Sequence, residues 1–321
     1  MAREVDLAGE FIYAGLEKMN SMNSIDEPSE AFFVLYHFAI GIERLQKVLL
    51  VLVNDIQPND MGNFLKGIKH HNHGELSAEI KKHIKINFSK EQNAFLQVLA
   101  DFYEKRRYDK YDFFSYDMEA LNNLSKFLKD NYPDYEGCYS QLSDRYLINE
   151  NIKEYMGRIV GKICQKYYSE IHRISFERNV YSYELRVGTP AYKIFMTNDA
   201  KTSYQKELDK EKYAIKELLI FLHNSKKTNS FFRFIKSVKP LDFDIALVEG
   251  YIRDLCKKNV STDLIDEVEY HWYETDAFSK EELERRKEML DVIGSDETAF
   301  DMYDDMNLVQ RIWLKLKYRL S

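Results

Sequence analysis

The chain has 321 residues, of which 45% are hydrophobic and 31% are charged, the balance of a folded globular protein. Only 12 Gly and 5 Pro are present, too few for a β-sandwich or β-barrel, which needs turn residues about every eight to twelve positions. Aromatic residues reach 14%, which argues against long disordered regions. We therefore expect a mainly helical protein with one large domain or two ordinary ones.

The cysteines and the apolar segments bear on the cellular compartment. Cys138, Cys164 and Cys256 are too few and too widely spaced for a disulfide framework or a cysteine-based zinc site, so we expect reduced, buried thiols. The first residues do not resemble a signal peptide. The most apolar run, residues 48–53, is far shorter than the roughly 20 residues that span a bilayer. The sequence predicts a cytoplasmic protein that does not enter membranes.

The net charge of −7 is unevenly distributed. Residues 140–240 carry eight more basic than acidic side chains, whereas residues 241–321 carry nine more acidic than basic ones. Two interpretations are open at this point. The basic block is a nucleic-acid face flanked by an acidic region, or the two blocks pack against each other.

Apolar periodicity predicts an opening helix over residues 5–19 and a second helix over 31–53. The second helix is apolar on nearly every side, and such a helix belongs in the middle of a bundle. Ser89 and Gln92 form a capping-box signature that opens a later helix. The other helices predicted in this half run to about residue 84 and over 118–132.

The clearest break in the chain follows Pro133, and it predicts a boundary between a helical bundle over 1–133 and a second helical region over 134–321. A long helix is predicted over 146–180. The segment 181–197 alternates and contains Gly188-Thr189-Pro190, which indicates a short hairpin or an irregular extended segment. Further helices are predicted over 200–225, 242–258, 262–274, 279–293 and 306–320.

Signatures of the common nucleotide-binding and hydrolytic sites are missing from the sequence. It contains no phosphate-binding P-loop, no G-x-G-x-x-G, no H-E-x-x-H and no G-x-S-x-G. His70, His71 and His73 are close together, but neighbouring helical side chains point apart and no Cys or Asp stands at ligand spacing. We expect neither a metal site nor a cofactor.

Three motifs of the first half follow one another in a characteristic order. The apolar helix carries Glu43 and Lys47, four residues apart, ahead of a run of aliphatic residues. Lys69, His71 and His73 then alternate at the start of the next helical segment. Each motif is weak alone, and their order carries the information.

Tyr103 and Arg107-Tyr108, at the end of a later helix, complete the set. Together these motifs resemble the HEPN superfamily over roughly residues 28–115, about a quarter of the chain. Members of this superfamily are helical bundles, common in prokaryotic toxins, antiviral defence proteins and nucleotidyltransferase partners. The resemblance implies a metal-independent endoribonuclease or a noncatalytic RNA-binding relative, usually dimeric.

The chain departs from the pattern of active members, in which an Arg is followed about four to six residues later by a His that handles the 2′-hydroxyl proton. No Arg of this sequence has a His at that distance. The nearest approach is Arg178, with Tyr183 in place of the histidine, and a tyrosine is a poor base near neutral pH. Either the activity is lost or it uses a different set of residues.

Such a set exists if the stretch 69–74 packs beside the end of the helix that reaches residue 108. Histidine transfers protons near neutral pH, and arginine binds phosphate through two hydrogen bonds. The candidate catalytic residues are Arg107, His73, His71 and Tyr103, and Lys69 and Tyr108 are candidate RNA contacts.

A purely structural interpretation of the same residues stays open. The stretch 69–73 then only caps its helix, and Arg107 only forms an ion pair with Glu43 or Asp109. The long helix adds Lys153, Arg158 and Lys162, which interleave with tyrosines as RNA-binding residues do, although an ordinary protein interface has the same composition.

These observations predict an all-α, HEPN-like protein that acts on RNA in a toxin or phage-defence setting, as a homodimer and with a possible regulatory protein partner. The alternative is a noncatalytic helical module that binds a protein. The missing Arg–His spacing and the acidic net charge favour this alternative, whereas the basic helix and the histidine-rich stretch favour RNA.

Overall fold

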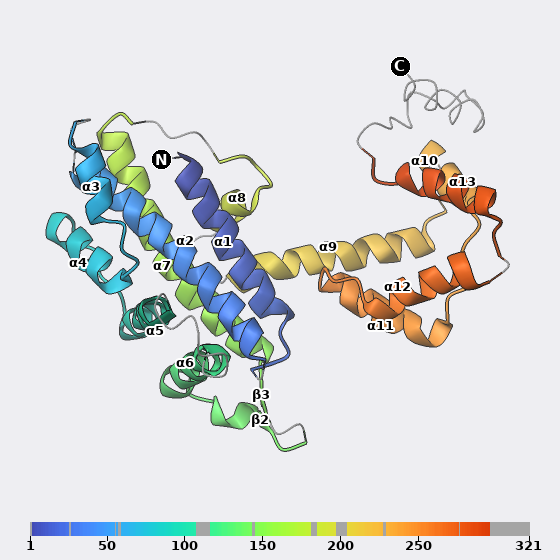
Figure 1. Cartoon of the computed structure of the whole chain (residues 1–321), viewed down its shortest axis with the longest axis horizontal. Helices are drawn as coiled ribbons and strands as arrows, with labels where there is room; N and C mark the ends of the chain where they lie inside the picture. Colours follow the sequence, from blue (N-terminus) through green and yellow to red (C-terminus); the bar gives the residue numbers. More distant parts are fainter. Residues whose placement is uncertain are drawn as a thin grey trace. The chain divides into compact units, whose positions relative to one another are not determined.

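The computed structural model describes residues 2–25, 27–54, 56, 59–106, 116–142, 145–180, 185–196, 204–226, 229–275 and 277–295. Within helices, the side chains of residues 2, 103–106, 116–118 and 205–207 are not part of the description. The fold is all-α: these ranges contain thirteen α-helices and one small sheet, as predicted. The chain forms two compact units, Met1–Glu211 and Lys212–Ser321, which are described separately below (Figure 1).

Three long helices form the centre of the first unit, α1 (Ala2–Ser21), α2 (Pro28–Asn54) and α7 (Glu150–Glu177). They lie side by side, and α2 also contacts the shorter helices around it (Figure 1). The side chains of Phe38 and Leu49 on α2 have no exposed surface. The prediction that this largely apolar helix would occupy the middle of a bundle is confirmed, because α2 contacts α1, α4, α5, α6 and α7.

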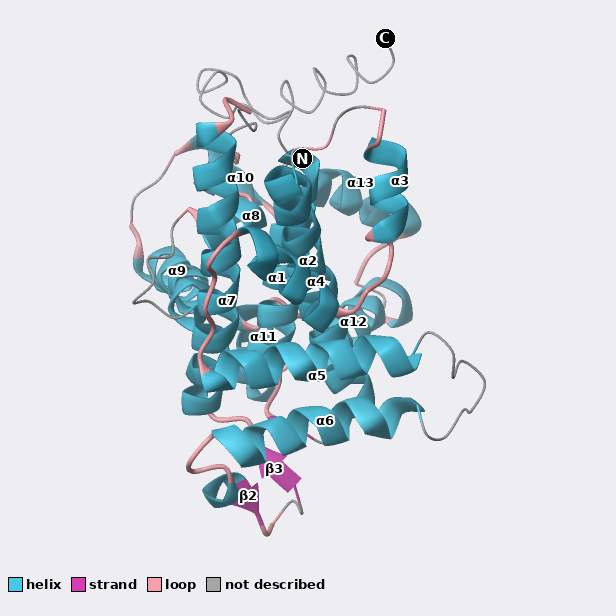
Figure 2. Cartoon of the chain, turned by 90° about the vertical axis from the view of Figure 1, so that its left-hand side faces the viewer, coloured by secondary structure: helices cyan, strands magenta, loops and turns pink. Residues whose placement is uncertain are grey.

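Four shorter helices follow α2 in the chain, namely α3 (Met61–Gly67), α4 (His73–His83), α5 (Lys90–Arg106) and α6 (Tyr116–Asn131), and α4, α5 and α6 pack against it. The capping box that opens α5 is present: Ser89 N donates to Gln92 Oε1 at 3.0 Å, and Gln92 N donates to Ser89 Oγ at 3.3 Å. Figure 2 shows α5 and α6 side by side at one end of the unit. The Phe95 ring of α5 joins them, 5.2 Å from the ring of Phe127.

The small sheet sits at the start of α7. Its antiparallel strands are β1 (Ser24–Ile25), β2 (Tyr139–Ser140) and β3 (Arg145–Leu147), in the order β1-β3-β2, with a 3-10 turn at Glu136–Cys138. The long helix therefore begins at Glu150 rather than at residue 146. Asn149 stops the helix from extending further back, since its side chain accepts a hydrogen bond from Ile152 N at 2.9 Å as an N-cap.

The prediction of a hairpin or extended segment near 181–197 is corrected by α8 (Pro190–Phe195). Residues 185–196 contain no strand, and residues 181–184 lie outside the described part of the chain. Thr189 caps the helix and Pro190 occupies its first position, where a missing N–H costs nothing. The Thr-Pro pair, which indicated a turn, is thus the start of a helix. This helix packs closely on α1, where Gly9 has no side chain and leaves room for Ala191.

The predicted boundary at 133/134 falls inside the first unit. The reason is that α7, assigned by sequence to the second region, packs against α2 in one continuous core. The break after Pro133 leads into the small sheet rather than into a linker. The first unit ends instead within α9 (Tyr204–Asn224), where Glu211 accepts hydrogen bonds from Tyr13 Oη at 2.6 Å and Lys193 Nζ at 2.5 Å.

The second unit contains the rest of α9, then α10 (Ser230–Ser237), α11 (Ile245–Cys256), α12 (Thr262–Glu269), a π-helix (Tyr270–Glu274) and α13 (Lys280–Asp291). The helix predicted over 306–320 lies outside the described residues. Cys138, Cys164 and Cys256 are buried and free. In the part of the chain that the structure describes, no helix is long and apolar enough to cross a membrane.

The burial of α2 leads to a prediction for stability. Leu49→Ala should lower the free energy of unfolding by about 2–5 kcal/mol, because it leaves a cavity beside a side chain that has no exposed surface. Leu7→Ala on α1, a side chain that is 42% exposed, should change it by less than about 0.5 kcal/mol. Urea denaturation followed by circular dichroism measures both, and equal losses would contradict the central position of α2.

Candidate functional site

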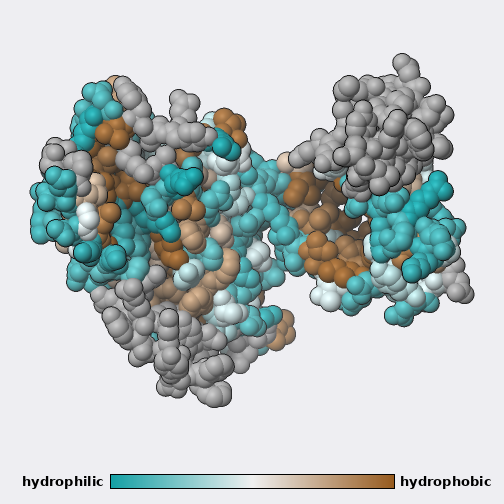
Figure 3. All heavy atoms as spheres, turned by 45° about the horizontal axis from the view of Figure 1, so that its top comes forward, coloured by the Kyte–Doolittle hydropathy of each residue, from teal (hydrophilic) through white to brown (hydrophobic). Residues whose placement is uncertain are grey.

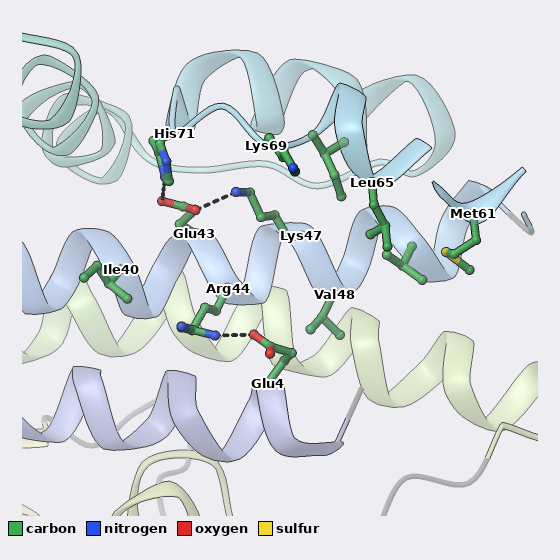
Figure 4. Close-up of a pocket in the computed structure, with 12 residues that line it drawn as sticks. Glu4, Ile40, Glu43, Arg44, Lys47, Val48, Met61, Leu65, Lys69 and His71 are labelled. Atoms are coloured by element: carbon green, nitrogen blue, oxygen red, sulfur yellow. Dashed lines mark hydrogen bonds and ion pairs between the residues drawn. The ribbon is translucent and has the colours of Figure 1, made fainter. Parts of the chain in front are cut away.

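A pocket of about 530 Å³ opens on the first unit between α1, α2, α3 and the stretch that leads into α4 (Figure 4). This volume lies in the usual range for small-molecule sites. Both charged and aliphatic side chains line its wall. The lining residues are Glu4, Ile40, Glu43, Arg44, Lys47, Val48, Val51, Met61, Leu65, Ile68, Lys69 and His71.

The pocket brings together two of the motifs that carry the resemblance to the HEPN superfamily. Glu43 Oε1 accepts a hydrogen bond from Lys47 Nζ at 2.6 Å, and Glu43 Oε2 lies 2.8 Å from His71 Nδ1. Figure 4 shows the carboxylate between these two partners. The Glu43 side chain is only 9% exposed, whereas those of Lys47 and His71 are 24% and 22% exposed. A largely buried carboxylate therefore holds two partly exposed groups at the pocket wall.

The contact with Glu43 also selects the tautomer of His71. An ionised carboxylate only accepts hydrogen bonds, so the neutral imidazole donates from Nδ1 and its acceptor lone pair is on Nε2. A carboxylate that orients a histidine in this way stabilises the imidazolium that forms after proton uptake. The Glu43–His71 contact thus fixes the orientation of a partly exposed imidazole at the pocket wall.

Positive charge exceeds negative charge around the pocket. Arg44 forms an ion pair with Glu4 across the α1–α2 interface, and Lys69 is exposed at the entrance to α4. With Lys47, the wall carries three permanent cations against the two carboxylates Glu4 and Glu43. Arg44 and Lys47 are each paired with one of these carboxylates, so the excess positive charge is that of Lys69.

His73, two residues after His71, occupies a different environment. Its side chain has no exposed surface, and it does not line the pocket. Gln46 Nε2 donates to the His73 carbonyl oxygen at 3.1 Å and to Tyr167 Oη at 3.0 Å, while Gln46 Oε1 lies 2.9 Å from His73 Nδ1. A carbonyl oxygen only accepts, so the amide orientation is fixed and His73 Nδ1 carries the proton.

Burial lowers the pKa of His73 to about 4 and keeps the ring neutral near neutral pH. A catalytic role for His73 requires contact with substrate, which a fully buried ring does not offer. The side chain of Asn72 caps α4 by accepting a hydrogen bond from Glu75 N at 3.0 Å. The structural interpretation of this stretch therefore applies to Asn72 and His73, and the pocket residues are Lys69 and His71.

The third motif cannot be placed. Tyr103 belongs to α5, but its side chain is not described, and Arg107 and Tyr108 lie outside the described residues. The suggested ion pair of Arg107 with Glu43 or Asp109 falls outside them as well. The partners of Glu43 that the structure shows are Lys47 and His71.

The basic residues of α7 separate into two groups. Lys153 is buried, 7% exposed, and its Nζ pairs with Glu150 at 3.0 Å, so it is removed from the proposed RNA face. Arg158 and Lys162 are exposed one turn apart. Lys166, one turn further, donates to the Asn87 carbonyl oxygen at 2.6 Å and therefore has a structural role.

Sequence reasoning missed a cationic surface next to these residues. Two ammonium groups lie close to the Phe88 ring: Lys166 Nζ is 5.2 Å and Lys81 Nζ is 5.9 Å from the ring centroid. The spacing of Arg158, Lys162 and Lys166 was visible in the sequence, but the approach of the α4–α5 connection to α7 was not.

No group of three or more His, Cys, Asp or Glu side chains in the described ranges is arranged to hold a metal ion. No family model matches the chain, and neither a curated protein nor a solved structure shows significant similarity to it. The resemblance to the HEPN superfamily therefore stays a prediction.

The buried His73 leads to a prediction for pH dependence. In the unfolded chain, His73 is protonated below its ordinary pKa of 6.5. In the folded protein, the buried ring stays neutral down to about pH 4. Between these values the free energy of unfolding should fall as the pH falls, by about 3 kcal/mol in total. Urea denaturation at a series of pH values measures this loss.

The variant His73→Gln should lack this part of the acid destabilisation, whereas the exposed His83→Gln should retain it. Identical pH profiles for the protein and His73→Gln would show that His73 is not buried and neutral in the folded state.

Proposed function

We propose that the first unit is a HEPN-like, metal-independent endoribonuclease whose reacting phosphate binds in the pocket of Figure 4. The observation that carries the proposal is the Glu43–His71 pair, held at the wall of a pocket with an excess of cations. The missing Arg–His spacing is then no obstacle, because a base and phosphate-binding cations come together from α2 and from the stretch before α4.

In this proposal His71 accepts the 2′-hydroxyl proton at Nε2, and Glu43 stabilises the imidazolium. The 2′-oxygen attacks the adjacent phosphorus, the bond to the 5′-oxygen breaks, and the leaving oxygen takes up the proton. Lys47, Lys69 and Arg44 stabilise the negative charge of the phosphorane. The products are a 2′,3′-cyclic phosphate and a 5′-hydroxyl end.

The cellular setting of the proposal follows from the resemblance and from the composition. It is a cytoplasmic toxin or antiviral-defence protein that works as a homodimer and is controlled by a protein partner. The composition supports the cytoplasm through its unpaired, buried cysteines. The exposed Arg158 and Lys162 support RNA as the partner, since they extend the cationic surface beyond the pocket.

The proposal predicts cleavage of end-labelled tRNA in the presence of EDTA. His71→Asn should reduce the rate by about 10²–10⁴-fold, because the proton acceptor is lost. Glu43→Gln should also slow cleavage, because an amide orients the ring without stabilising its charged form. Discrete fragments with 2′,3′-cyclic phosphate ends are the expected products.

His83→Asn is the matched control, a partly exposed histidine on α4 whose Nε2 lies 3.9 Å from Glu79. It should cleave like the unmodified chain. If the His71 variant is folded and cleaves as fast as this control, the assignment of the base is wrong.

RNA retention on α7 is a separate prediction. The double variant Arg158→Ala, Lys162→Ala should bind single-stranded RNA more weakly, and the slope of log K against log salt should fall by about 0.7 for each lost phosphate contact. Lys126→Ala with Lys129→Ala, two exposed lysines on α6, is the control and should leave the slope unchanged. Filter binding at a series of salt concentrations measures both slopes. If the α7 variant and the α6 control have equal slopes, α7 does not contact RNA.

A noncatalytic protein-interaction module is the second candidate, and the exposed apolar side chains of the second unit favour it. A folded protein that neither cleaves nor retains RNA in these experiments would support this alternative.

A further inference from the structure

Helix α11 of the second unit presents an apolar face to solvent. Ile245, Ile252 and Leu255 follow a helical spacing of seven and three residues, and they are 89%, 41% and 43% exposed. Buried residues on this helix are Tyr251 and Cys256. The face is therefore a surface of the unit rather than part of its core.

The apolar surface extends beyond α11. Figure 3 shows hydrophobic residues gathered over a broad area of the second unit. A folded domain rarely exposes a large apolar surface unless a partner or another segment covers it. Other large hydrophobic side chains of this unit that are more than one-third exposed are Tyr213, Leu218, Ile220, Phe221, Leu222, Phe243, Leu247, Val260, Ile265, Tyr270, Tyr273 and Ile293.

The chain itself carries a segment of matching character at its end, beyond the described residues. In the predicted helix over 306–320, Val309, Ile312, Trp313, Leu316 and Leu320 recur at the spacing of one helical face. Residues 306–321 also contain four basic side chains and no acidic one. The pattern predicts a basic amphipathic helix.

Charge and chain length favour the second unit as the place where this segment binds. Residues 241–295 carry eight more acidic than basic side chains, the complement of the basic segment. The ten residues 296–305 can span up to about 33–36 Å when extended. Helix α11, with its 12 residues, is about 18 Å long, which is shorter than this connection can span.

We propose that residues 306–320 bind as an amphipathic helix to the apolar face of α11 in the same molecule. The apolar side chains of the segment cover Ile245, Ile252 and Leu255, and its basic side chains meet the acidic residues around them. This inference does not depend on the proposed ribonuclease activity.

Tryptophan fluorescence of the full chain tests the proposal. The sequence contains two tryptophans, Trp272 and Trp313, so Trp272→Phe leaves Trp313 as the only reporter. Its emission should lie at shorter wavelength than that of a synthetic peptide of residues 304–321, and acrylamide should quench it less. High salt should weaken the contact and shift the emission toward that of the peptide.

A matched pair of substitutions on α11 locates the contact. In the Trp272→Phe chain, Ile252→Asp should shift the Trp313 emission to that of the peptide, because a charge in the apolar contact weakens it by at least about tenfold. Leu247→Asp should leave the emission unchanged. Leu247 is 43% exposed, as Ile252 is 41%, but it lies about 140° around the helix axis.

Four results would overturn the proposal. The emission of Trp313 could equal that of the peptide in the unsubstituted reporter chain, or respond equally to both Asp substitutions. It could return to the peptide value on dilution, which would mean that a second copy supplies the segment. It could also shift to shorter wavelength only when vesicles of phosphatidylcholine and phosphatidylserine are added, which would make the segment a membrane-surface helix.

Discussion

The amide of Gln46 joins three helices of the first unit. It lies on α2, has no exposed surface, and contacts the backbone and ring of His73 on α4 and the hydroxyl of Tyr167 on α7. Tyr167 extends the network through a hydrogen bond to Ser77 on α4, and burial raises its pKa to about 12, which keeps the phenol neutral. A buried amide or imidazole without a partner costs about 1–3 kcal/mol, so these groups specify one arrangement of the three helices.

The position of the pocket depends on this network. Because His73 is fixed inside the unit, the residues just before it must leave the core on the side of α2 that carries Glu43 and Lys47. His71 then meets Glu43 at 2.8 Å, and Lys69 remains exposed at the wall of the pocket. One stretch of five residues thus supplies both a buried structural histidine, His73, and a partly exposed one, His71. The hydrogen bonds of Gln46 hold His73 in the buried position.

The two units use their apolar residues in different ways. In the first unit the long helices enclose a continuous core, and the buried Lys153 directs its Nζ to the exposed carboxylate of Glu150. In the second unit the short helices α10 to α13 bury few large side chains, among them Phe234, Tyr251 and Leu283. Helices of this length are marginal alone, so their stability depends on tertiary packing within the unit.

The sequence by itself determined the helical class, the central position of α2 and the capping box of Ser89 and Gln92. These features depend on local periodicity and on neighbours within four residues, which any reader of the sequence can see. Through the resemblance it also indicated one set of motifs, of which the structure brings Glu43, Lys47, Lys69 and His71 together at the pocket but not His73. Only the tertiary structure decided that His73 is buried, that Lys153 is paired, and that the first unit extends to Glu211. Burial and pairing depend on the distant segment that packs against a residue. Gln46 lies 27 residues before His73, so the residues next to His73 in the sequence do not indicate this contact.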